Sequence, residues 1–358
     1  MFPLEKSFNL ISKSEVPELD GAIVRTFLQV DKNSFLVGTK GKGLFRFSSK
    51  FYLDPEKPIE YQNYNENNSP INNAVFSLFK GQNNLIFIGS DGEGISIFDL
   101  KKSKLINWTD ITGSKNCDYF KSVYSIYQDE NGFIWLGTNG YGMLRCKIER
   151  LGENLKITDF KKYLAVNNQK NTLSSNIIFS IIPKNKNQLW IGTRLGGLNL
   201  FDKKSEHFTI YKNNPNDAAS LSNNDILCLQ TDAENRLWIG TSFGLNLLNS
   251  LKNGSKASFK SFTVKDGLPN NTIHGIVCDK KNNLWLSTNF GLSNFNSKQL
   301  KFTNYTRNEG LQNNEFADGA FYQDAASECI FMGGIKGFNY FRPQKIKESN
   351  AIPDLFIK

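Results

Sequence analysis

One five-residue phrase, in its clearest form Leu-Trp-Ile-Gly-Thr, occurs seven times along the chain in intact or degraded copies. The copies occupy residues 35–39, 86–90, 134–138, 189–193, 237–241, 284–288 and 330–334. The fourth residue of each copy, here called the anchor, is Gly38, Gly89, Gly137, Gly192, Gly240, Ser287 or Gly333. Successive anchors are 46 to 55 residues apart. A period of this length with strand-type content indicates a β-propeller that has one sheet in each repeat.

We therefore expect an all-β fold, a single seven-bladed β-propeller of four-stranded antiparallel blades. The length of 358 residues alone would suggest two or three domains, but seven repeats use almost all of it. Each blade needs its neighbours to cover both faces of its sheet, so the blades are not separate domains. The propeller is expected to span residues 1–343, and no apolar run is long enough to cross a bilayer.

Each repeat also has particular residue types at fixed distances from its anchor. An aromatic side chain stands two residues before the anchor in six copies, and we expect it to fill the wedge between neighbouring sheets. A second glycine follows the anchor by four or five residues and supplies the positive φ of a tight hairpin. The resulting Gly-x-Gly strings join strand to strand, so they are not phosphate-binding loops, which open a helix.

The two ends of the chain are expected to close the ring together. An outer-strand pattern follows each of the first six repeats, but none follows the seventh, where Pro343 disfavours a further paired strand. Before the first repeat stands the segment Phe-Asn-Leu-Ile at residues 8–11, an outer-strand pattern that has no blade of its own. We predict that this segment pairs with the seventh blade and removes the open edge.

The net charge of +9 raises the question of a polyanionic partner. Only eight of the 43 basic residues are arginine, the side chain best suited to bidentate phosphate contact. The lysines are spread thinly through turns. A specific nucleic-acid site is therefore not expected, whereas a polyanionic carbohydrate remains possible.

The five cysteines lack metal-binding or redox spacing, and buried free thiols are the simplest interpretation. The two histidines also lack the spacing of metal ligands, so we expect no metal and no cofactor. The first residues show no basic-then-apolar signal region, so the chain is either cytosolic or a piece whose leader lies elsewhere.

The repeats resemble the two-component regulator propeller family, whose hallmark is Leu-Trp-Ile-Gly-Thr-x-x-Gly-Leu after an Asp-x-x-Gly turn. Residues 134–138, 189–193 and 237–245 match this pattern closely, while the first and seventh copies are degraded and Ser287 replaces the sixth anchor. The resemblance covers roughly residues 8–343.

The resemblance implies a function. In that family such repeats form the extracytoplasmic, periplasmic sensing part of hybrid two-component sensors, ahead of an immunoglobulin-like domain, a membrane helix and a histidine kinase. Many members are similar to sensors of oligosaccharides. Residues 344–358 would then be a linker or the start of the immunoglobulin-like domain, and the kinase would lie outside this chain. The expected partners are an oligosaccharide, the remaining receptor domains and a second copy in a receptor dimer, with the membrane reached only through the parent protein.

A ligand is expected on the face shared by the loops that enter the first strands and the hairpins that join second to third strands. Amides beside aromatic rings suit the hydroxyl-rich edges and apolar faces of sugars. The candidate ligand-binding residues are Arg194, Tyr141, Asn139, Asn176, Asn224, Phe243, Asn271, Phe290 and Asn314. The loop asparagines have a second interpretation, because they can simply cap turns through side-chain-to-backbone bonds.

Two alternatives to a sensor stay open. His274 begins a first strand beside Asp225 and Glu315 of neighbouring loops, which leaves a lyase or hydrolase acting on glycans as one alternative. No catalytic arrangement follows from spacing, so we assign no catalytic residue. The other alternative is a non-catalytic scaffold for interaction or dimerisation.

Overall fold

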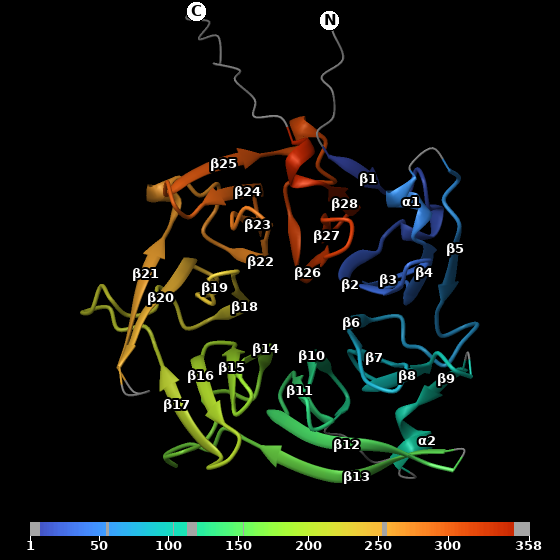
Figure 1. Cartoon of the computed structure of the whole chain (residues 1–358), viewed down its shortest axis with the longest axis horizontal. Coiled ribbons are helices and arrows are strands. Elements are labelled where there is room, and N and C mark those ends of the chain that lie inside the picture. Colours follow the sequence, from blue (N-terminus) through green and yellow to red (C-terminus); the bar gives the residue numbers. More distant parts are fainter. Residues whose placement is uncertain are drawn as a thin grey trace, which may run out of the picture.

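The computed structural model describes residues 8–54, 57–102, 104–112, 120–152, 154–252 and 256–346. In these ranges, seven four-stranded antiparallel sheets stand around a common axis, as Figure 1 shows. The expected seven-bladed propeller is confirmed. Four of the five cysteines lie in the described residues and are free thiols, while Cys117 lies outside them. Most of the expected linker, residues 347–358, also lies outside them.

The first four blades follow one another in chain order, each from inner to outer strand. Blade 1 contains β2 (Ile23–Asp31), β3 (Ser34–Lys40), β4 (Leu44–Ser48) and β5 (Tyr61–Tyr64), with α1 (Lys50–Leu53) before β5. Blade 2 contains β6 (Val75–Lys80), β7 (Leu85–Ser90), β8 (Ile95–Asp99) and β9 (Lys104–Asn107), followed by α2 (Trp108–Thr112). Blade 3 contains β10 (Val123–Gln128), β11 (Phe133–Thr138), β12 (Met143–Leu151) and β13 (Asn154–Tyr163). Blade 4 contains β14 (Ile178–Asn185), β15 (Gln188–Thr193), β16 (Gly197–Asp202) and β17 (His207–Tyr211).

The last three blades continue the ring, and short 3-10 helices precede or follow several strands. Blade 5 contains β18 (Ile226–Thr231), β19 (Leu237–Thr241), β20 (Gly244–Lys252) and β21 (Lys256–Phe262). Blade 6 contains β22 (Ile273–Cys278), β23 (Leu284–Thr288), β24 (Gly291–Asn296) and β25 (Lys301–Tyr305). Blade 7 contains β26 (Phe316–Asp324), β27 (Cys329–Gly334), β28 (Gly337–Phe341) and β1 (Asn9–Ile11). The 3-10 helices are η1 (Pro17–Leu19), η3 (Val264–Asp266), η4 (Arg307–Glu309) and η5 (Pro343–Lys345).

The N-terminal strand closes the ring, as the sequence predicts. β1 pairs antiparallel with β28, in a register that places Asn9 opposite Tyr340 and Ile11 opposite Phe338. The two ends of the described chain therefore meet in one sheet, on one side of the ring (Figure 1). This pairing supplies the outer strand that residues after β28 do not form.

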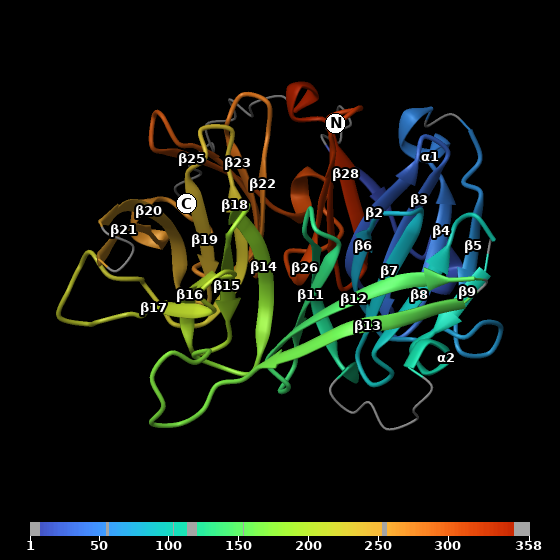
Figure 2. The ribbon, with the colours of Figure 1, turned by 60° about the horizontal axis from the view of Figure 1, so that its bottom comes forward.

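The tryptophan of the repeated phrase both packs and donates a hydrogen bond. Trp238 is 1% exposed, and its Nε1 donates to Asp232 Oδ2 over 2.8 Å. Trp135 donates in the same way to Asp129, the first residue of the preceding turn. The turn aspartate thereby satisfies the one polar atom of a large buried ring. Figure 2 shows the blades after a turn of 60° from the view of Figure 1. The apolar clusters that contain Trp135 and Trp238 combine residues of adjacent sheets.

The anchor glycine is required by the next blade. A Cβ at Gly240 would stand 2.9 Å from Ile273 Cγ2 of blade 6 and 2.4 Å from Cys228 Sγ of its own blade. In blade 6 the roles are exchanged, because Ser287 occupies the anchor and Gly275 stands opposite it. In these blades the residue twelve positions before the anchor is small and lies opposite the anchor on the neighbouring strand. One residue of each such pair must be a glycine, or nearly as small, so that the side chains of the next blade fit against it.

The ring has two distinct faces. The hairpins between second and third strands lie against the loops that enter the first strands of the next blade. For example, the backbone N–H groups of Gly140 and Gly142 both donate to Asn176 O over 3.0 Å. We call this side the upper face. The turns between first and second strands, such as the turn that contains Asp279, lie at the other ends of these strands and form the lower face.

Candidate functional site

Each of the first six blades has a bulge near the start of its inner strand. In β2 the register with β3 shifts between Val24 and Thr26, which leaves Arg25 without a cross-strand partner. A bulge of this kind re-aims the side chain of the extra residue. The equivalent residues of the next five blades are Phe76, Tyr124, Phe179, Leu227 and His274. In blade 7 the irregularity lies between Phe316 and Phe321 and includes Asp318.

These seven residues form a ring around the propeller axis, here called the axial ring. One half of it is aromatic. The rings of Phe76 and Tyr124 stack with centroids 4.7 Å apart at 13°, and Tyr124 stacks on Phe179 at 5.8 Å and 12°. The Arg25 guanidinium lies over the Phe76 ring, 4.4 Å from its centroid, at the first end of this stack. Four consecutive blades thus contribute a continuous stack of planar groups.

The other half of the axial ring is ionic. His274 Nδ1 lies 2.5 Å from Asp318 Oδ1, and His274 Nε2 lies 2.7 Å from Asn289 Oδ1. Burial alone would lower the pKa of His274, but hydrogen bonds to these two oxygens and the charge of Asp318 raise it above its usual value. An imidazolium donates from both nitrogens, which is what two flanking oxygens favour.

The same interactions act on the carboxyl group. Burial would raise the pKa of Asp318, but the hydrogen bond and charge of His274 lower it below its usual value. The positive charges of Arg25 and Arg194 contribute in the same direction. Both shifts favour the charged forms of the pair, the imidazolium and the carboxylate.

A second set of side chains stands two residues past each anchor, next to the axial ring. Asn139 Nδ2 donates to the hydroxyl of Tyr124 over 3.0 Å, and that hydroxyl lies 3.4 Å from Asp91 Oδ2. Asn289 belongs to the same set and holds His274, as described above. The predicted residue Asn139 is thus brought into the site. Arg194 is exposed and acts on it through its charge.

The side-chain amide oxygens of the four predicted loop asparagines accept hydrogen bonds that hold the loops. Each Oδ1 accepts a backbone N–H from its own loop: Ala165 to Asn176, Asn213 to Asn224, Val264 to Asn271, and Arg307 to Asn314. Each backbone carbonyl accepts an N–H from a hairpin glycine of the preceding blade. These residues connect adjacent blades, in line with the turn-capping interpretation.

The predicted aromatic residues lie at hairpin tips of the upper face. Phe243 and Phe290 are about half exposed, at 52% and 50%, and Tyr141 is half-buried. The N–H groups of all three donate to the threonine that ends the repeated phrase, Thr138, Thr241 or Thr288. They stand on the expected face.

The sequence analysis missed most of the axial ring. It placed His274 beside Asp225 and Glu315, whereas its carboxylate partner is Asp318; Asp225 instead accepts from Ser242 Oγ over 2.6 Å. The sequence does contain a signal for the axial positions. In the first six blades the axial residue directly precedes the small residue found twelve positions before the anchor.

Comparison with known proteins identifies the repeats. A model described as two component regulator propeller matches residues 120–140, 220–243 and 267–290. These ranges contain the first two strands of blades 3, 5 and 6. Three of the seven repeats thus match the two-component regulator propeller repeat. A comparison with curated proteins found no match.

Solved structures resemble this propeller over almost its whole length. The extracellular domain of BT3049 from B. thetaiotaomicron, described as a hybrid two component system, matches with a TM-score of 0.77 and 24% identity. Two structures of the extracellular domain of BT4673 from the same organism match with TM-scores of 0.71 and 0.72 at 21% and 20% identity. The alignments cover 94–97% of this chain but only 42–44% of those structures, and at these identities they establish the shared fold.

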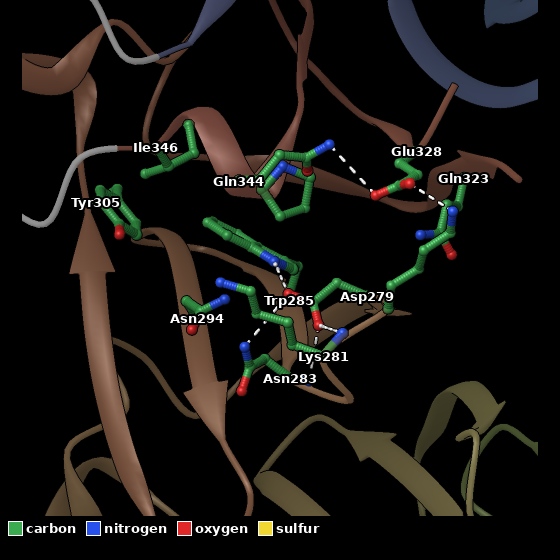
Figure 3. A pocket seen from close by; sticks show the side chains of 12 residues that line it. Asp279, Lys281, Asn283, Trp285, Asn294, Tyr305, Gln323, Glu328, Gln344 and Ile346 are labelled. Atoms are coloured by element: carbon green, nitrogen blue, oxygen red, sulfur yellow. Dashed lines mark hydrogen bonds and ion pairs between the residues drawn. The ribbon is translucent and has the colours of Figure 1, made fainter. Parts of the chain in front are cut away.

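A separate pocket of about 270 Å³ lies on the lower face of the propeller, between blades 6 and 7 (Figure 3). Trp285 lines it, but its ring is 2% exposed and its Nε1 donates to Asp279. Glu328 pairs with Lys280 and accepts from Gln344 Nε2. These carboxylates have their partners within the pocket, whereas Arg25 of the axial ring has a buried Nε without a hydrogen-bond partner.

Two further observations concern the described residues. No helix there is long and apolar enough to cross a membrane. Nor does this part of the chain bring three or more His, Cys, Asp or Glu side chains into an arrangement suited to a metal ion.

Proposed function

We propose that this chain is the ligand-sensing propeller of a hybrid two-component sensor. It binds an oligosaccharide on its upper face, on the periplasmic side of the membrane, and passes the signal to a histidine kinase outside this chain. The family of its repeats and its similarity to extracellular domains of B. thetaiotaomicron support the sensor assignment. Its other partners are the remaining receptor domains and a second copy in a receptor dimer.

The observation that carries the ligand proposal is the division of the axial ring into an aromatic half and an ionic half. Sugars present apolar faces to aromatic rings and hydroxyl edges to amides and charged groups. Phe179 ends the aromatic stack and is half-buried, so part of the ring is accessible. Across the ring axis, His274, Asp318 and Asn289 supply the polar side.

Calorimetry with a panel of oligosaccharides tests this proposal. We expect saturable binding to the wild type and an affinity about two- to tenfold weaker for Phe179→Ala, since one aromatic contact contributes about 0.5–1.5 kcal/mol. Arg194→Ala should also weaken binding. Lys281→Ala, in the lower pocket, is the control and should bind as the wild type does. Equal affinities for all four proteins would contradict the upper-face site.

The arrangement of His274 supports binding rather than catalysis. Both of its ring nitrogens are engaged by side chains of the chain itself, so neither is directed at a substrate proton. The same glycan panel tests the alternative of a lyase or hydrolase through turnover. A pure scaffold would show neither binding nor turnover.

A further inference from the structure

Arg25 differs from the other half-buried arginines of the described chain. Arg46 donates to Ser34 Oγ, and Arg145 and Arg236 pair with aspartates. Arg342 donates to backbone carbonyls. Arg25 makes no hydrogen bond or ion pair of this kind with any described residue, and its Nε, like that of Arg145, is buried without a partner. The contact recorded for its guanidinium is a cation–π contact with the face of Phe76.

A buried guanidinium N–H without an acceptor, such as that of Arg25 Nε, is costly. A guanidinium has five N–H donors and cannot become neutral in a protein. Burial lowers the pKa of Arg25, and the more distant charges of Asp318, Tyr124 and Asp91 only partly oppose this. Buried polar groups in native proteins almost always have a partner, so an exception needs an explanation. A ligand oxygen that arrives from the upper face would supply the partner.

We infer that Arg25 is the anion-binding residue of this site and that the ligand is an acidic oligosaccharide, with a carboxylate or sulfate group on a sugar ring. The inference rests on the proposed function. The contact with Phe76 holds the guanidinium carbon 4.4 Å from the ring centroid, and a guanidinium can form a bidentate pair with an oxyanion. The aromatic residues beside it face the apolar side of the same sugar.

The neighbouring carboxylate does not prevent this binding. Asp318 is paired with His274, so below the pKa of His274 the two together are neutral. Arg194 adds a second positive charge close enough to act on Asp318. The other charged group near the aromatic half is Asp91, whose Oδ1 accepts from Ser122 Oγ over 2.5 Å.

An immobilised glycan panel tests the inference. It contains galacturonate and glucuronate oligosaccharides, sulfated oligosaccharides, and neutral oligosaccharides of the same length. We expect the wild type to retain one acidic class over the neutral sugars, and the class retained distinguishes carboxylate from sulfate. Arg25→Gln should lose at least about tenfold in affinity, as for a hydrogen-bonded charged group. Arg307→Gln removes the same charge from an exposed position of the upper face and should bind as the wild type does.

The failures are distinguishable. Neutral and acidic glycans retained equally, with Arg25→Gln unchanged, would overturn this inference and leave the proposed function standing. No retained glycan would overturn both. Thermal unfolding supplies a second measurement, in which Arg25→Gln should melt at or above the wild-type temperature because the buried, unsatisfied Nε N–H is removed. A large fall in that temperature, also seen for Arg25→Lys, would show a structural role and overturn the inference.

Discussion

Phe8 packs edge-on against Phe341, with ring centroids 4.9 Å apart and ring planes at 80°. Residues near the two ends of the described chain are thereby joined in one apolar cluster. Phe8 also contacts Tyr305 of blade 6 at 5.2 Å, so the N-terminal segment connects two blades as well as completing one. The closure of the ring therefore depends on side-chain packing in addition to the three-residue strand β1.

Replacing Phe8 with alanine should destabilise the propeller strongly. The side chain is 1% exposed, and removing a buried phenylalanine costs about 3–5 kcal/mol in the free energy of unfolding. Phe243→Ala, at a hairpin tip with 52% exposure, is the control and should change that free energy by less than about 0.5 kcal/mol. Urea unfolding measures both, and similar losses in the two variants would contradict the closure.

Asp232→Asn should also be destabilising. Asp232 Oδ2 accepts from Trp238 Nε1 and from Arg236 Nε over 2.8 and 2.7 Å, and its side chain is fully buried. Removing the charge leaves Arg236 with only the half-exposed Glu234, 3.4 Å away, as a carboxylate partner, and breaking a buried pair costs about 3–5 kcal/mol. The upper part of that range is not expected because Arg236 is 28% exposed. Denaturant unfolding measures the loss, and a change below about 0.5 kcal/mol would be contrary to the account.

The same variant should change the acid limb of stability. Burial would raise the pKa of Asp232, but hydrogen bonds from Trp238 and Arg236 lower it below its usual value. A depressed carboxyl pKa contributes stability above the unfolded value of about 3.9, and this is lost as pH falls through the folded value. The wild type should therefore lose stability more steeply than Asp232→Asn below about pH 4. Parallel pH profiles would be the opposing result.

His274→Gln should matter most at mildly acidic pH. Since the pKa of His274 is raised in the folded protein, its contribution to stability is fully present below the unfolded value of about 6.5. It is lost as pH rises through the folded pKa. The difference in unfolding free energy between wild type and variant should be larger at pH 5.5 than at pH 8.5. If the difference in unfolding free energy grew as the pH rose, it would contradict a protonated His274 in the folded protein.

Blade 6 offers a matched pair of substitutions at one contact. Gly275→Ala would place a Cβ 2.5 Å from Phe321 Cδ1, and overpacking of this kind costs about 1–3 kcal/mol. Ser287→Ala removes a buried hydroxyl that has no hydrogen-bond partner in the described chain, so it should be neutral or slightly stabilising. Thermal unfolding compares them, and a larger loss for Ser287→Ala would reverse the expected order.

The fold could be predicted because each position of the repeated phrase has one physical requirement. Trp238 needs a wedge and an acceptor, Gly240 must leave room for Ile273, and the hydroxyl of Thr241 accepts from the hairpin and donates to Gly244 O. These requirements recur in most of the blades, so the sequence repeats them with few exceptions. The missing outer strand of blade 7 likewise pointed to the segment at residues 8–11.

The site was harder to predict because its residues do not repeat. The axial position accepts Arg25, Phe76, Leu227 or His274 without altering the blade, so no recurrent residue type marks it. Loop asparagines do recur, but recurrence there reflects the hydrogen bonds between blades. In a repeat protein, the conspicuous residues maintain the repeat, while a site is built where the repeats differ.

A crystal structure of the propeller with an oligosaccharide retained from the glycan panel tests the central claim most directly. The account predicts the sugar on the upper face, stacked beside Phe179 and with an oxyanion against Arg25. A sugar seated instead in the lower pocket, over Trp285 and Lys281, would contradict it.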